Sequence, residues 1–173
     1  MKPRCTSTPV RLHRGFTLVE IMIAVVILGI LITIAVPTYR RFQRKSQNTT
    51  FVNNLRIFTQ SFETYAMKTG AWPQSVGAGV VPAGMSGEFR EADWTTGSLG
   101  GQWRWDGWPS HGSKPNIQPW GPVTAAISIV GVNVDQSQMD EIDAIVNAGN
   151  TSGSRSFQKT ADSPLTYTYI VQK

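Results

Sequence analysis

Cysteine and histidine are scarce in this chain of 173 residues. The one cysteine, Cys5, lies within the first fifteen residues, so the rest of the chain cannot form an intramolecular disulfide. Of the two histidines, only His111 lies beyond that segment, in a stretch of Gly, Ser and Pro. The sequence also lacks a phosphate-binding glycine loop, zinc-ligand spacing and a serine nucleophile elbow. These absences argue against an enzyme, and no catalytic residue or cofactor is predicted.

Acidic residues are absent from residues 1–15, which carry Lys2, Arg4, Arg11 and Arg14. The whole chain has a formal net charge of +5, from 16 basic and 11 acidic residues. Without the four basic residues of this segment the two signs nearly balance. The excess positive charge therefore belongs to the first segment, and the rest of the chain is not predicted to bind nucleic acid.

Charge is almost missing again from residues 16–36, FTLVEIMIAVVILGILITIAV, where Glu20 is the one charged residue. A helix of this length spans roughly 30 Å, the thickness of the hydrocarbon core of a bilayer. The alternative is a helix buried in a soluble core, but such segments usually run to about 10–14 residues. In lipid the backbone must satisfy its own hydrogen bonds, which favours a helix despite the many β-branched residues. We predict a single membrane-spanning helix.

The junction between these two segments reads G-F-T-L-V-E-I over residues 15–21, followed by the apolar run. This pattern resembles the prepilin cleavage and methylation signature of type IV pilins and type II secretion pseudopilins, over roughly residues 14–39. The resemblance implies that a prepilin peptidase removes a leader, residues 1–15, by cutting between Gly15 and Phe16. It also implies that Phe16 is N-methylated and that the subunit moves from the inner membrane into a filament of pilin-like subunits.

Glu20 has two interpretations. A carboxylate in an apolar helix costs about 2.5–3.5 kcal/mol on insertion scales, so it needs a partner or a wet position. Cleavage would create an α-amine on Phe16, largely charged at neutral pH, which could pair with Glu20 of the same or a neighbouring subunit and fix the register of a filament. Alternatively, Glu20 lies in the first helical turn, favoured by the helix dipole and close to the headgroups.

Basic residues flank the apolar run on both sides, since Arg40, Arg41, Arg44 and Lys45 follow it. A count of basic residues therefore does not decide the orientation in the membrane. The resemblance implies a single-pass inner-membrane protein with a cytoplasmic leader, handled by a secretion or pilus assembly platform and built into a periplasmic or extracellular filament. The basic cluster would then meet anionic headgroups or the acids of a neighbouring subunit, or remain solvated.

Helical periodicity continues beyond the apolar run. Pro37 removes one backbone hydrogen bond, so we predict a helix kink there. Residues 40–50 are polar all round and are predicted to be solvated or packed in a filament. Gly70, with Lys68 before it, predicts the end of one long helix over residues 16–68. Apolar residues recur every three or four positions and predict a face packed on the head: Phe51, Leu55, Phe58, Phe62 and Tyr65.

Residues 70–122 are rich in Gly and Pro and predicted to be mostly loops, with one strand over residues 102–106. All six tryptophans lie there: Trp72, Trp94, Trp103, Trp105, Trp108 and Trp120. Tryptophan clusters can bind sugars, but in a small domain without disulfides they more often supply the core.

Further strands are predicted over residues 123–130, with a possible extension to residue 134, and over residues 165–171. Between them a helix is predicted to begin at Asp135, with Gln138 completing a capping box and Met139, Ile142, Ile145 and Val146 forming its apolar face.

These elements predict an α+β fold, with a long N-terminal helix, a transmembrane first half and a small antiparallel sheet in a pilin-like head. The expected segments are a leader (residues 1–15), the transmembrane half of the helix (16–36), its amphipathic half (37–69) and the globular head (70–173).

No metal site is predicted, although the resemblance raises the question because major pseudopilins often bind calcium. Asp140, Glu141 and Asp143 are close in sequence, but helical spacing spreads them over a solvated face. Three further aspartates are isolated in sequence and would need the fold to bring them together: Asp93, Asp106 and Asp162.

The predicted function is structural, that of a subunit of a type II secretion pseudopilus or a type IV pilus. Many type IV pilins close a disulfide in the head, and its absence here favours the pseudopilus. The alternative is a membrane-tethered, tryptophan-rich adhesin or carbohydrate-binding module.

Leader cleavage is directly testable. A peptidase that works at the membrane surface needs a small residue before the cut, where it can approach the backbone closely. Mass spectrometry of the mature protein should find N-methylated Phe16 as its first residue, and Gly15→Leu should leave the leader attached. An assembled protein that still carries residues 1–15 would contradict this prediction.

Overall fold

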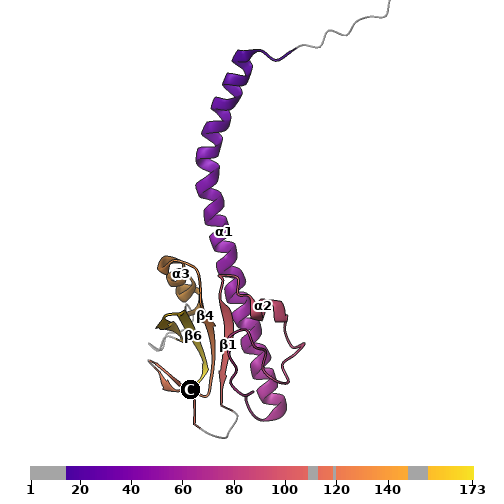
Figure 1. Cartoon of the computed structure of the whole chain (residues 1–173), viewed down its shortest axis with the longest axis vertical. Helices are drawn as coiled ribbons and strands as arrows, with labels where there is room; N and C mark the ends of the chain where they lie inside the picture. The colour runs from indigo at the N-terminus through magenta and orange to yellow at the C-terminus, as the bar shows by residue number, and fades with distance from the viewer. Residues whose placement is uncertain (1–14, 109–112, 119, 148–155) are drawn as a thin grey trace, which may run out of the picture. The chain divides into compact units, whose positions relative to one another are not determined.

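The computed structural model describes residues 15–108, 113–118, 120–147 and 156–173 (Figure 1). The elements in chain order are α1 (Leu18–Thr69), α2 (Glu91–Thr95), β1 (Gln102–Gly107), β2 (Asn116–Ile117), β3 (Gly121–Pro122), β4 (Ala125–Val130), α3 (Gln136–Asn147), β5 (Phe157–Asp162) and β6 (Leu165–Gln172). The chain forms two compact units, residues 1–41 and 42–173, and α1 contributes to both. The leader up to residue 14 and His111 lie outside the described residues.

The first unit contains the apolar part of α1. Its large hydrophobic side chains are all exposed, from Leu18 at 76% to Val36 at 45%. This part of the helix is long and apolar enough to cross a membrane, with a mean hydropathy of 2.9. Helical backbone begins at Leu18, two residues after the predicted start, and it continues through Pro37. An apolar surface of this extent needs a cover of lipid or protein.

In the second unit, α1 is the helix against which the head folds. The predicted stripe is confirmed, because Phe51, Leu55, Phe58 and Phe62 are each at most 3% exposed. The fifth predicted member, Tyr65, is only partly buried and packs against the same core. The helix ends at Thr69, where Gly70 adopts a positive φ of 78° and its N–H donates to the carbonyl of Ala66 at 2.9 Å. Glycine takes this left-handed conformation without a steric penalty, so the predicted stop is also confirmed.

The sheet of the head is antiparallel, in the order β1-β4-β6-β5. β4 lies in the middle of the sheet, and five of its six residues are buried. Its side chains alternate between two apolar clusters: Ala125, Ile127 and Ile129 belong to the main core, whereas Ala126 packs on the other face with Ile117 and Val123. The small β2–β3 hairpin therefore covers part of the face that is turned away from the main core.

Aromatic rings fill the main core. Phe62 stacks on Trp105, with ring centroids 3.8 Å apart and planes only 3° apart, and Phe51 stacks on Trp103 at 4.9 Å. Trp94 meets Phe58 edge to face at 4.9 Å. Trp94, Trp103 and Trp105 are at most 1% exposed, so half of the tryptophans are core residues. The other half is only partly buried: Trp72, Trp108 and Trp120.

Several details of the head differ from the predictions. β4 ends at Val130 and does not extend to residue 134, because Gly131 turns the chain with a φ of 78°. Ile145 in α3 was predicted to belong to the buried face of that helix, but it is 46% exposed. The predictions did not include β5, the β2–β3 hairpin or α2.

The core stripe generates a stability prediction. We expect fragment 42–173 to fold alone, because the main core lies wholly within it. Phe62→Ala should lower its free energy of unfolding by about 3–5 kcal/mol through the loss of buried aromatic packing. Ile57→Ala is the matched control on the same helix, where Ile57 is 40% exposed, and it should cost less than about 1 kcal/mol. Equal costs in urea unfolding would mean that the stripe does not anchor the head.

Candidate functional site

The predicted processing residues lie at the start of α1. Gly15 and Phe16 precede the helix and are exposed, with Phe16 at 78%. Glu20 lies in the first turn, and Pro37 lies about 25 Å further along the same helix. The structure therefore brings the first three of these residues together and leaves Pro37 apart.

Thr17 and Glu20 form a reciprocal cap at the start of α1. The hydroxyl of Thr17 accepts a hydrogen bond from the N–H of Glu20 at 3.3 Å, and the N–H of Thr17 donates to Oε2 of Glu20 at 3.4 Å. The carbonyl of Thr17 accepts the first helical bond, from Ile21. This arrangement is the capping box that the pattern T-x-x-E encodes, and it was not among the predictions. Within a single chain, Glu20 thus helps to cap the N-terminus of α1.

Hydroxyl groups further along the first unit bond to its backbone. Thr33 Oγ1 donates to the carbonyl of Gly29 at 2.8 Å, and Thr38 Oγ1 donates to that of Ile34 at 2.9 Å. These bonds satisfy polar side chains inside an apolar helix, where an unpaired hydroxyl would be costly.

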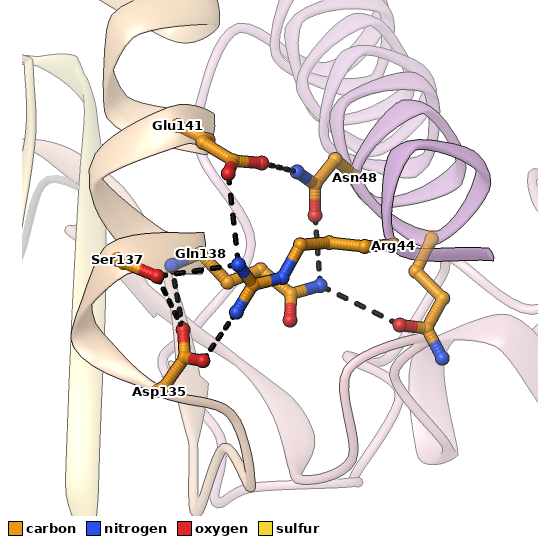
Figure 2. Close-up of polar contacts among 7 residues, drawn as sticks. Arg44, Asn48, Asp135, Ser137, Gln138 and Glu141 are labelled. Carbon is orange, nitrogen blue, oxygen red and sulfur yellow. Dashed lines mark hydrogen bonds and ion pairs between the residues drawn. The ribbon is translucent and has the colours of Figure 1, made fainter. Parts of the chain in front are cut away.

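A polar network joins α1 to the start of α3 within the head (Figure 2). Arg44 pairs with Asp135, donates to Ser137 Oγ at 3.2 Å and lies 3.7 Å from the Glu141 carboxylate. One residue of the basic cluster, predicted to meet headgroups, a neighbouring subunit or solvent, is instead paired within its own head.

The network continues into the buried interface between the helices. Asn48 is 3% exposed and Gln138 is 5% exposed. Gln138 Nε2 donates to Asn48 Oδ1 at 2.8 Å, and Asn48 Nδ2 donates to Glu141 Oε2 at 2.8 Å. The prediction that residues 40–50 are solvated or packed in a filament is therefore wrong at Asn48, which is buried against α3.

Asp135 is the cap of α3, as predicted. Its Oδ1 accepts from the N–H of Gln138 at 2.8 Å. The predicted capping box is only half formed, since the side chain of Gln138 turns to Asn48. The pKa of Asp135 lies below its usual value, mainly because the carboxylate accepts the hydrogen bond from the Gln138 N–H. The hydrogen bond from the Ser137 hydroxyl and the charge of Arg44 lower it further. The carboxylate thus stays available to Arg44 in mildly acidic solution.

The isolated aspartates do not converge. Asp106 pairs with Arg104 at 2.9 Å, Asp93 with Arg90 at 3.8 Å, and Asp162 with Lys159. Among the described residues no three His, Cys, Asp or Glu side chains gather in a way that could hold a metal ion. These acids take part in local ion pairs.

Comparison with known proteins supports the N-terminal assignment. Residues 10–36 match the family model described as the prokaryotic N-terminal methylation motif. The chain is similar to the fimbrial protein EcpC of Eikenella corrodens, with 32% identity over 46% of this chain and 52% of the relative. It is 33% identical to a type IV major pilin protein PilE1 of Neisseria gonorrhoeae, over 40% of this chain and 32% of the relative. It is 48% identical to the type IV major pilin protein PilA of Myxococcus xanthus, over 25% of this chain and 20% of the relative.

The alignments span about half or less of each of these relatives. No solved structure matches the chain. The chain carries the prokaryotic N-terminal methylation motif, and its long apolar helix and four-stranded antiparallel sheet are consistent with a pilin-like α+β fold.

The buried amides of the network generate a further prediction. Asn48→Ala would remove the buried hydrogen bonds that Asn48 makes with Gln138 and Glu141, at a cost of about 1–3 kcal/mol in the free energy of unfolding of the head. Asn53→Ala is the matched control, because Asn53 is exposed on the same helix. Chemical unfolding of both variants checks this, and equal effects would show that the network adds no stability.

Proposed function

We propose that this protein is a structural filament subunit, cleaved by a prepilin peptidase after Gly15, N-methylated at Phe16 and assembled with copies of itself and other pilin-like subunits. The observation that carries the proposal is the part of α1 over residues 18–36, whose large apolar side chains are all exposed and which lies within the matched methylation motif. Such a helix has two suitable environments, the inner membrane and the centre of a filament. The relatives support this, since their names describe fimbrial proteins and major pilins.

Glu20 is the proposed assembly residue. In the described part of the chain, both bonds from Thr17 reach Oε2 of Glu20. Oε1 is therefore available to the α-amine of Phe16 on a neighbouring subunit. In the low dielectric of packed apolar helices, this pairing would neutralise two charges and fix the axial position of each subunit.

The filament is a type II secretion pseudopilus or a type IV pilus, with the head outside the cytoplasm and a matching assembly platform in the inner membrane. The names of the relatives favour the pilus. The lack of cysteine after residue 5 favours the pseudopilus. Pro37 is the proposed kink, because it cannot donate a hydrogen bond to the carbonyl one turn before it.

Substitution of Glu20 separates membrane insertion from assembly. Glu20→Leu and Glu20→Gln remove a charge that costs about 2.5–3.5 kcal/mol in a membrane helix, so insertion should be at least as efficient as before. Leader cleavage should also persist. Incorporation into sheared filaments should be lost, because the Phe16 amine of the neighbour has no partner. The measurement compares filament and inner-membrane fractions of the same cells.

Thr17→Ala is the control, since it removes the cap but keeps the carboxylate of Glu20. It should reach filaments at nearly normal levels. If Glu20→Leu is cleaved and assembles normally, or if Thr17→Ala fails equally, then Glu20 acts only as a helix cap and the pairing mechanism is wrong.

A further inference from the structure

A pocket of about 530 Å³ lies in the head where α1 ends beside the last residues of β6. Its walls include two of the partly buried tryptophans, Trp72 and Trp108, together with Glu63, Thr124 and Gln172. The volume is in the range of small-molecule sites, which combine apolar walls with a few polar groups. None of these residues takes part in the proposed assembly through Glu20.

Trp72 is held in place on one side of the pocket. Its Nε1 donates to Gln172 Oε1 at 2.8 Å. Its ring lies 5.5 Å from that of Trp105, which is fully buried. Because both partners belong to the folded head, the ring is fixed before any ligand arrives, which lowers the entropic cost of binding.

Trp108, in the same lining, is also held in place. Its N–H donates to the carbonyl of Thr124 at 2.9 Å. The ammonium of Lys114 lies over its ring, 5.2 Å from the centroid, and donates to Thr124 Oγ1 at 2.9 Å. A cation already lies against this ring, so a second cation placed against it would be repelled.

Glu63 adds a negative charge to the lining. The negative charge of Glu63 disfavours anions in the pocket, and the positive charge of Lys114 disfavours cations beside Trp108. The electrostatics of the pocket therefore favour a neutral ligand.

We propose that this pocket binds a neutral saccharide, with a sugar ring placed against Trp72 and Trp108. The indole rings offer apolar faces for the C–H side of a sugar. Gln172 Nε2 can donate, Glu63 can accept, and the Thr124 hydroxyl can donate to sugar hydroxyl groups. The site is a property of the head and does not depend on filament assembly.

The test uses the full chain, purified in an amine-oxide detergent that has no sugar headgroup. Glucose, galactose and N-acetylglucosamine serve as probes, and saturation-transfer NMR together with tryptophan fluorescence reports binding. At least one sugar should bind, with its ring protons closest to the protein. Trp108→Ala should weaken it about tenfold or more, the scale of a lost aromatic stack. Glu63→Gln, which leaves the packing unchanged, should weaken it several-fold.

Trp120→Ala is the matched control, because Trp120 is also partly buried but packs against the second apolar cluster. It should leave the affinity unchanged, and circular dichroism should show native heads in all variants. Three results would each overturn the proposal: no sugar binds at millimolar concentration, Trp120→Ala weakens binding as much as Trp108→Ala, or tetramethylammonium or acetate competes for the same residues.

Discussion

Stacking of the α1 aromatic rings on the tryptophans of β1 is the contact on which the head depends. After residue 5 the chain has no cysteine, so no disulfide can hold the head together. Phe51 instead stacks on Trp103 and Phe62 on Trp105. These rings fix β1 on the helix, and β4 and β6 then extend the sheet from it. Large rings bury more area per residue than aliphatic side chains, which suits a small domain without cross-links.

The same helix has two different chemical characters. In residues 18–36 the large apolar side chains are all exposed, whereas from Phe51 onward one stripe is buried under the sheet. Between them, Arg44 and Asn48 bond to the first turns of α3. A charged residue that looks like a membrane-flanking group in sequence thus helps to hold the head on its helix. The helix cap at Thr17 and Glu20 similarly gives a second task to a residue proposed for assembly.

Patterns within one element were readable from the sequence, whereas pairings across elements were not. The spacing of Phe51, Phe58 and Phe62 predicted a buried face, and alternation predicted β1 and β6. β5 was missed because only Phe157 in it is fully buried, so no alternation is visible. The pair Arg44 and Asp135 is separated by 91 residues and depends on how the sheet returns the chain to the helix. The Thr17–Glu20 cap is a local pattern that the sequence does contain.

The two edges of the four-stranded sheet are both protected. Along β1, the N–H groups of Val76 and Gly79 donate to the carbonyls of Trp105 and Trp103, so a loop occupies that edge. On β5, the opposite edge, Lys159 carries a charge and pairs with Asp162. Charged or covered edges hinder the addition of strands from other molecules. In the proposed filament, heads crowded at high local concentration would therefore stay separate folding units and would not add strands to one another's sheets.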